Sequence, residues 1–199
     1  VSLILKLNEK RMRPLFFKVK EFVLDDPNNT EIILSRNVLL YHLCEKLIIK
    51  LKSIFIPFLV YVYEAAIEEI KSFVKLFSNE ALLKKVKSSS NLSWRVESLK
   101  HVLIMLEKCF VYDAAAFAIK GNEDYEKFVN KARFNTIVGP LTDVLTCCAV
   151  DRVKIEVDYV TLMESYLTPC IANLALAAGS DELWKALHHR LCLLTRHEK

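Results

Sequence analysis

Apolar residues recur at helical spacing in the sequence, and this periodicity is the strongest constraint on the fold. The clearest stripe consists of Leu40, Leu43, Cys44, Leu47, Ile48 and Leu51. Positions three and four residues apart share one face of an α-helix, so the stripe predicts a helix that buries one side against a neighbour. The chain has only 3 glycines and 5 prolines in 199 residues, too few turn-forming residues for a sandwich or barrel of many short strands. We therefore expect an all-α protein.

The same pattern, interrupted by helix breakers, divides the chain into successive helices. We expect them over residues 12–24 with Pro14 in the first turn, from Thr30 to a kink or short break at Pro57, from there to about residue 77, over 93–112, within 123–134, over 134–148 with an irregularity at Gly139-Pro140, over 154–177, and from Ser180 onward. Gly179 is expected to end the seventh helix and Ser180 to cap the last one. Residues 84–93 (KKVKSSSNLS) form the most loop-like tract, and we expect a mobile connection there.

The order of these helices indicates how they assemble. Helices of roughly fifteen to twenty residues, joined by short turns into pairs that repeat about every 40 to 47 residues, are typical of HEAT and armadillo arrays. We expect residues 1–199 to form a single region of an α-solenoid built from HEAT/armadillo-like antiparallel helix pairs. A closed helical bundle is the structural alternative. Because the chain does not begin with Met, we also expect it to be a fragment of a much longer protein.

The most apolar stretch of the chain, residues 37–66, is too charged at its edges to favour a membrane span. Its longest uncharged run, Ser53 to Tyr63, is shorter than the roughly 20 residues that cross a bilayer. Lysines on one flank and glutamates on the other would have to enter hydrocarbon, at several kcal/mol for each centrally placed charge. The six cysteines lie in apolar or helical-looking runs, which favours a reducing compartment over a disulfide framework.

Histidine and cysteine residues occur close together in two places, and neither pattern favours chemistry. His42 and Cys44 are two residues apart, so on a helix they point about 200° away from each other and cannot form a nucleophile–base pair. His188, His189, Cys192 and His197 form the one metal-ligand candidate. Their spacing is not that of a structural zinc site, and exposed residues of a helix are the alternative reading. The sequence has no glycine-rich phosphate loop and no hydrolase or metalloprotease motif, so we expect no catalytic residue, metal or cofactor.

Basic residues are concentrated near the N-terminus and again on the helix of the clearest stripe. The candidates for contact with RNA or a partner are Lys10, Arg11, Arg13, Lys18, Lys20, Lys46 and Lys50. Such cations can neutralise backbone phosphates without reading sequence, although a solvated helix face is the ordinary alternative. The formal net charge is only +4, with a pI near 8.7, so the composition permits an acidic partner without requiring one.

Five ordered blocks of sequence resemble the C-terminal region of one family. They are residues 6–19 (KLNEKRMRPLFFKV), 36–58 (RNVLLYHLCEKLIIKLKSIFIPF), 106–113 (LEKCFVYD), 133–145 (RFNTIVGPLTDVL) and 168–196 (TPCIANLALAAGSDELWKALHHRLCLLTR). The chain is similar in these blocks to the HEAT repeat-containing protein 1 family, called small nucleolar RNA-associated protein 10 in fungi, which is the large HEAT-repeat subunit of the small-subunit processome. The blocks span nearly the whole chain.

The resemblance implies a function as well as a fold. It implies an α-solenoid scaffold without an active site, in the nucleolus of the nucleus, that supports pre-ribosomal RNA transcription and early processing toward the small-subunit rRNA. The implied partners are other processome proteins of the early transcription-associated subcomplex, and pre-ribosomal RNA is a further possible partner; no membrane and no small-molecule substrate are expected. A HEAT or armadillo adaptor in nuclear transport or chromatin assembly is the alternative on the same fold, and a hydrolase or metal enzyme is a third class.

Overall fold

The computed structural model describes residues 9–24, 30–79, 81–83, 91–149 and 159–196, and the regular structure in these ranges is helical. The elements are α1 (Glu9–Leu24), α2 (Thr30–Leu51), a 3-10 turn η2 (Lys52–Ile54), α3 (Ile56–Ser78), α5 (Asn91–Asp124), α6 (Lys131–Ala149), α7 (Tyr159–Leu162), a π-helical turn η3 (Met163–Leu167), α8 (Thr168–Ala178) and α9 (Asp181–Arg196). The prediction of an all-α protein is confirmed.

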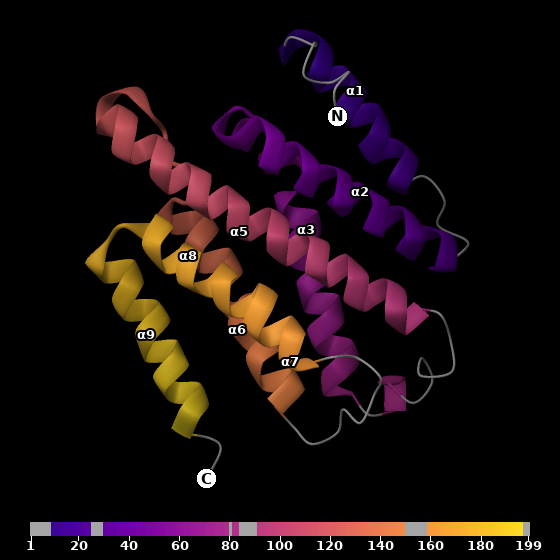
Figure 1. Cartoon of the computed structure of the whole chain (residues 1–199). Helices are drawn as coiled ribbons and strands as arrows, with labels where there is room; N and C mark the ends of the chain where they lie inside the picture. The colour runs from indigo at the N-terminus through magenta and orange to yellow at the C-terminus, as the bar shows by residue number, and fades with distance from the viewer. Residues whose placement is uncertain (1–8, 25–29, 80, 84–90, 150–158, 197–199) are drawn as a thin grey trace.

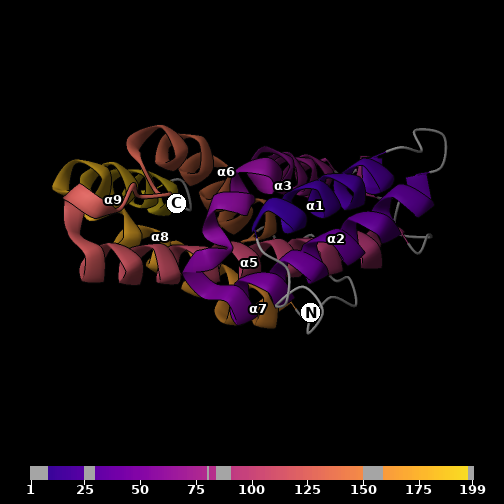
Figure 2. The same ribbon diagram turned by 90° about the horizontal axis from the view of Figure 1, so that it is seen from above.

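The helices form two layers that alternate along the chain. One layer contains α1, α3, α6 and α9, and the other contains α2, α5 and the continuous α7–α8 segment (Figure 2). Within the second layer α5 lies between α2 and α8, and the three helices run in the same direction (Figure 1). The pair α1 and α2 lies at one end of the array and the pair α8 and α9 at the other. This open, repeating arrangement is that of an α-solenoid rather than of a closed bundle.

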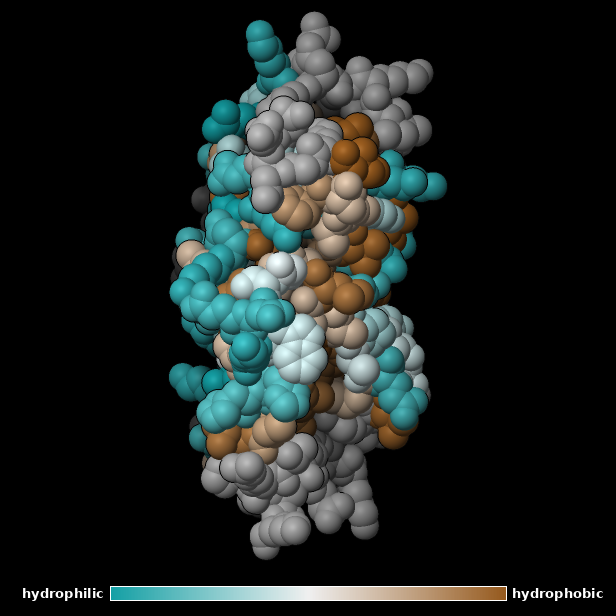
Figure 3. All heavy atoms as spheres, turned by 90° about the vertical axis from the view of Figure 1, so that its left-hand side faces the viewer, coloured by the Kyte–Doolittle hydropathy of each residue, from teal (hydrophilic) through white to brown (hydrophobic). Residues whose placement is uncertain are grey.

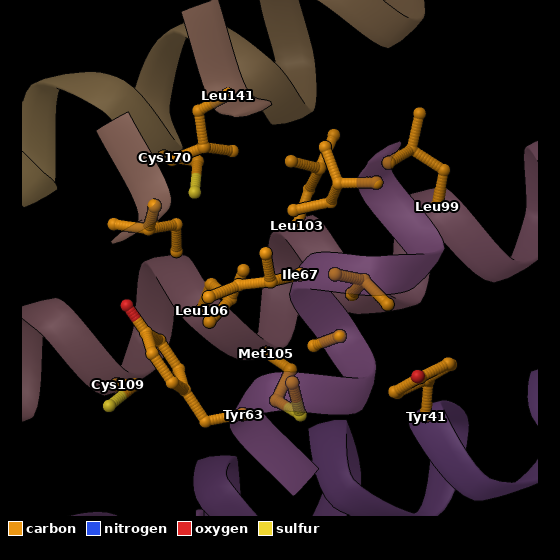
Figure 4. Packing of buried hydrophobic residues seen from close by; sticks show 14 of the residues in the cluster. Tyr41, Tyr63, Ile67, Leu99, Leu103, Met105, Leu106, Cys109, Leu141 and Cys170 are labelled. Carbon is orange, nitrogen blue, oxygen red and sulfur yellow. The ribbon is translucent and has the colours of Figure 1, made fainter. Parts of the chain in front are cut away.

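The hydrophobic core lies between the two layers along their whole length. Leu99, Leu103 and Leu106 of α5 are fully buried or nearly so, and side chains from α2, α3, α6 and α8 surround this helix (Figure 4). Cys44 of the predicted stripe is fully buried and His42 is exposed, as expected from their angular separation on α2.

The predicted break at Pro57 is confirmed, and the structure shows how it is made. α2 ends at Leu51, and Lys52 then has a φ of 54°, in the left-handed region that residues with a Cβ rarely adopt. Lys52 is the first residue of the 3-10 turn η2, and α3 begins at Ile56 with Pro57 in its first turn. The missing N–H of a proline costs no hydrogen bond at that position.

Residues 123–134 do not form the separate helix that the sequence predicted. α5 runs from Asn91 through to Asp124, well beyond the expected end near residue 112, and residues 125–130 connect it to α6. The last three residues of the predicted loop tract, 91–93, belong to α5, whereas residues 84–90 lie outside the described part of the chain. A run of three alanines, 114–116, favours continuation of the helix past residue 112.

The α5–α6 connection is held by the side chain of Asp113, which is completely buried. Its carboxylate accepts hydrogen bonds from the Tyr125 hydroxyl at 2.8 Å, the Phe128 amide at 2.8 Å and the Val129 amide at 2.9 Å. The guanidinium of Arg133 in turn donates to the Phe128 carbonyl at 2.8 Å. Buried amides outside a helix need such partners, so Asp113 supplies acceptors that the connection itself lacks.

Three further positions refine the helix boundaries. Pro14 lies inside α1, because this helix begins at Glu9 rather than near residue 12. α6 continues through Gly139 and Pro140 without the expected irregularity. Within the expected helix 154–177, residues 154–158 lie outside the described part, and the remainder contains the π-helical turn η3, two residues before Pro169. Proline lacks an N–H and disturbs the regular ladder, and such a turn is one way to accommodate it.

Gly179 ends α8 with a φ of 57°, as its position in the sequence predicted. A Cβ at this residue would lie 2.6 Å from Nζ of Lys127, which itself donates to the Ala177 carbonyl at 3.3 Å. We expect Gly179→Ala to lower the free energy of unfolding by about 1 kcal/mol, because alanine is strained at positive φ. Gly139→Ala is the matched control: its Cβ would meet Arg190 at an ordinary 3.6 Å, and the change should be neutral or stabilising. Equal losses in chemical denaturation would contradict this account.

Replacement of Asp113 tests the connection between α5 and α6. Asp113→Ala leaves the amides of Phe128 and Val129 without their acceptor, so we expect a loss of about 2–4 kcal/mol in the free energy of unfolding. Glu126→Ala, an exposed change in the same connection, should stay within about 0.5 kcal/mol. Urea denaturation followed by circular dichroism measures both variants, and a similar small effect for the two would show that Asp113 does not hold the connection.

Candidate interaction surface

The basic residues predicted to contact RNA or a partner do not form one surface. Lys10, Arg13 and Lys18 on α1 have exposed side chains and make no ion pair with any residue in the described part. The side chain of Arg11 lies outside the described atoms. The exposed cations of α1 are therefore available to an anionic partner.

Lys20 and Arg13 also face the neighbouring helix of the same layer. Lys20 Nζ donates to the Tyr61 carbonyl of α3 at 2.6 Å, and the Arg13 guanidinium lies over the Tyr61 ring at 5.6 Å. The ring of Phe17 packs against that of Tyr61, with centroids 4.7 Å apart. These contacts join α1 to α3, so Lys20 has a structural role in addition to its charge.

The two basic residues predicted on α2 differ in whether they form an ion pair in the described part. Lys46 pairs with Glu45 at 2.8 Å, whereas Lys50 is exposed at the end of the helix. An ion pair to a neighbouring carboxylate reduces the net charge that Lys46 presents to a partner. Within the predicted set, the charge available to a phosphate is thus concentrated on Lys10, Arg13, Lys18 and Lys50.

A buried cluster of ionisable side chains joins α2 to α5, and sequence reasoning did not identify it. Nδ1 of His101 lies 2.6 Å from Oε2 of Glu45, and its Nε2 lies 3.6 Å from Oε1 of Glu97. The His42 ring lies beside that of His101 in a tilted arrangement, with centroids 4.5 Å apart. Glu45 and His101 are 56 residues apart in sequence, so their pairing is visible only once the two helices are placed side by side.

The pKa of Glu45 reflects two opposing effects. Burial alone would raise it, but hydrogen bonds from Lys46 and His101 and the charges of these groups hold it below its usual range. Glu69, buried between α3 and α5, shows the opposite outcome, because burial raises its pKa despite the nearby Ser98 hydroxyl and Arg95. Both carboxylates follow the rule that burial disfavours charge unless specific partners stabilise it.

Arg190 of α9 anchors this helix to α6. Its Nε lies 2.5 Å from the Thr142 hydroxyl and its Nη2 lies 2.6 Å from Oδ1 of Asp143. In the same way Tyr63 of α3 donates to the Arg133 carbonyl of α6 at 2.6 Å. Asp113, Arg133 and Asp143 all belong to the sequence blocks quoted above, so those blocks contain the residues that join successive helices.

In the described part, the thiols and imidazoles show neither an activated thiol nor a cluster of metal ligands. Burial raises the pKa of the Cys44 thiol to about 12, and burial likewise raises the pKa of Cys109 and Cys170, so these thiols are poor nucleophiles at neutral pH. Of the predicted metal candidates, Sγ of Cys192 lies 3.6 Å from Nε2 of His188, and His197 lies outside the described residues. The described residues contain no group of three or more potential ligands.

Two surface features remain after these assignments. A groove of about 450 Å³ lies between α3 and α6, with Glu64 and Glu68 on one side and Arg133 on the other. By length and composition alone the helical stretch Val160–Ala178 could cross a membrane, and 28% of that stretch is buried inside the protein. Its buried residues, such as Cys170 and Leu174, belong to the hydrophobic core. Figure 3 shows a hydrophobic band beside hydrophilic areas on one face.

The pairing of Glu45 with His101 predicts a measurable dependence of stability on pH. The pKa of Glu45 is depressed in the folded state, so its ionised form stabilises the fold above the unfolded-state value of about 4.3 and this contribution is lost as the pH falls through the lower folded-state value. We expect Glu45→Gln to cost about 1–2 kcal/mol at pH 6–7 and progressively less below pH 4. Glu68→Gln, which changes an exposed pair with Lys71, is the control. A constant deficit across pH 3–7 in urea titrations would contradict the assignment.

Comparisons with known proteins agree with the resemblance in the sequence. The family model described as the BP28CT (NUC211) domain matches residues 1–118. HEAT repeat-containing protein 1 of Danio rerio is 28% identical over 98% of this chain, and the Homo sapiens protein of the same name is 26% identical over 98% of it. An uncharacterized protein of Arabidopsis thaliana is 28% identical over the full chain.

The alignments cover only a small part of these relatives. The chain corresponds to 9% of the Danio rerio and Arabidopsis thaliana proteins and to 8% of the human one. No solved structure matches the chain significantly. The family match covers more than half of the chain, and the relatives extend the similarity to nearly all of it. This chain therefore belongs to the BP28CT (NUC211) domain family, the C-terminal domain of HEAT repeat-containing protein 1 and its relatives.

Proposed function

We propose that this chain is part of a non-catalytic scaffold of the nucleolar small-subunit processome, where it supports pre-ribosomal RNA transcription and early processing toward the small-subunit rRNA. The observation that carries the proposal is its membership of the BP28CT family, with similarity to HEAT repeat-containing protein 1 along nearly the whole chain. The two-layered helical array suits this role, because its long outer surfaces can hold several partners at defined spacings.

The proposed scaffold function implies specific partners and a location. The partners are other processome proteins of the early transcription-associated subcomplex, and the location is the nucleolus. A tagged full-length protein should co-purify these proteins together with pre-ribosomal RNA, and its depletion should reduce the early cleavages. Recovery of transport cargo or chromatin proteins, without pre-ribosomal RNA, would instead favour a HEAT adaptor of another class. Recovery of neither would overturn both assignments.

The exposed cations of α1 are the residues that we propose for direct contact with RNA. Lys10, Arg13 and Lys18 carry three positive charges on one short helix without ion-pair partners in the described part, and such charges bind phosphates by releasing counterions. Lys20 and Lys46 are less suited to this contact, because their amines already bind the Tyr61 carbonyl and Glu45, respectively.

Charge reversal on α1 tests the RNA contact. If Lys10, Arg13 and Lys18 each neutralise a phosphate of single-stranded RNA, then changing all three to Glu should lower affinity at least tenfold and reduce the salt slope of log K by about 2. The control is the change of Lys71, Lys75 and Lys185 to Glu, which alters net charge equally at exposed positions of α3 and α9.

Both variants are measured by fluorescence anisotropy with a labelled single-stranded pre-rRNA fragment at several salt concentrations. Circular dichroism shows whether each remains folded. Equal losses for the two triple variants would assign binding to overall charge. An unchanged affinity and salt slope in the α1 variant would show that α1 does not touch RNA.

A further inference from the structure

An aromatic pair beside a cation lies on the surface between α1 and α3. The rings of Phe17 and Tyr61 are half-buried, with centroids 4.7 Å apart. The Arg13 guanidinium lies over the Tyr61 ring, 5.6 Å from its centroid, and the Arg13 side chain is itself exposed. Because an exposed group covers this face of the ring, the face borders solvent. A planar group can therefore reach the Tyr61 ring from outside.

The spacing of residues along α1 gathers cations beside this aromatic pair. One side of α1 carries, at intervals of three, four and three residues, Lys10, Arg13, Phe17 and Lys20. Lys10 and Arg13 are exposed. The Lys20 amine instead donates to the Tyr61 carbonyl at 2.6 Å and so holds α3 beside α1. The pair thus has two available cations toward the start of α1 and a positioning lysine on the other side.

The location of the pair keeps it accessible within a longer array. α1 and α3 are neighbours in one layer (Figure 2), and Phe17 and Tyr61 lie where these two helices meet. A helix packed against the side of α1 that faces away from α3 would not cover this junction. The site consequently does not depend on α1 being the first helix of its layer.

We propose that an unpaired base of single-stranded RNA stacks on the Tyr61 ring, in the place that the Arg13 guanidinium holds in this structure. Arg13 then turns to the adjacent phosphate, and Lys10 contacts the next one. Arg13 makes no ion pair in the described part, so this movement breaks no salt bridge. The inference rests on the RNA contact proposed for α1 and adds the recognition of a base to it.

Aromatic rings beside cations suit single-stranded rather than double-stranded RNA. Each base has a π-face that can stack on an aromatic side chain, and a neighbouring positive charge holds the backbone. Bases in an RNA duplex are stacked on each other, so a duplex offers no free base to Tyr61.

Two carboxylates limit the path of the RNA backbone. Glu21, one turn after Phe17 on α1, and Glu64, three residues after Tyr61 on α3, both have exposed side chains. Their charges repel phosphates. The backbone is therefore expected to leave the stacked base toward Lys10, over the first half of α1.

Two RNA probes separate stacking from contact with the backbone. One is a fluorescein-labelled CAACAACAA oligonucleotide, and the other has the same length with an abasic ribose at every position. Tyr61→Leu removes the ring, whereas Tyr61→Phe keeps it. Tyr112→Leu, at a half-buried tyrosine of α5 in the other layer, is the matched control. Fluorescence anisotropy at several salt concentrations measures binding, and circular dichroism shows whether each variant is folded.

We expect the wild-type chain to bind CAACAACAA at least about fivefold more tightly than the abasic probe, the lower limit for stacking of one base. Tyr61→Leu should remove this preference and leave the salt slope of log K unchanged, because that slope counts phosphate contacts. Tyr61→Phe and Tyr112→Leu should bind both probes as the wild type does. Phe17→Leu, which removes the second ring, should weaken the preference and replaces Tyr61→Leu in the test if that variant does not fold.

Other results would separate this inference from the RNA contact on which it rests. Equal affinity for the two probes, with charge reversal on α1 still lowering that affinity, would overturn stacking and retain the phosphate contact. No binding of either probe by the folded wild-type chain would overturn both and leave the aromatic pair as a contact between helices. A loss of preference in Tyr112→Leu as large as in Tyr61→Leu would also overturn the assignment of the base to Tyr61.

Discussion

The packing of α5 between α2 and α8 is the contact on which the rest of the array depends. α5 is the longest helix, it meets both of its neighbours in one layer, and it also supports α3 in the other. Removal of Leu103 or Leu106 from this helix would open a cavity at the centre of the structure rather than at its edge. The buried Glu45–His101 pair lies in the same interface, so a polar contact accompanies the apolar ones and restricts how α2 and α5 can align.

The helical class, the break at Pro57 and the end of α8 at Gly179 could be predicted from sequence because each depends on local chemistry. Periodicity reports which face is buried, proline lacks a donor, and glycine tolerates positive φ. The extent of α5 was predicted wrongly, because the α5–α6 connection is stabilised by Asp113, a residue about a dozen positions upstream of it. Lys20 and Lys46 show the same limitation: the sequence gives their charge, but Tyr61 and Glu45 determine how much of that charge is available.

The polar groups of the described part divide into internal contacts and outward charges. In the described part, Asp113 and Arg133 bind the connection between α5 and α6, and Arg190 joins α9 to α6. Among the predicted contact residues, the exposed cations without an ion pair in the described part lie on α1 and at the end of α2: they are Lys10, Arg13, Lys18 and Lys50. Internal polar contacts thus set the spacing of the helices, and the outward charges set the kind of partner that the surface can hold.

The π-helical turn before Pro169 determines which face of the α7–α8 segment is buried. Leu162 and Cys170 are eight residues apart, which in a regular helix would separate them by about 80° around the axis, yet both are buried almost completely. A π-turn accommodates one residue more than a regular turn, so Leu162 is brought back toward the face of Cys170. The π-turn thus takes up one extra residue without turning the buried face of this segment away from the core.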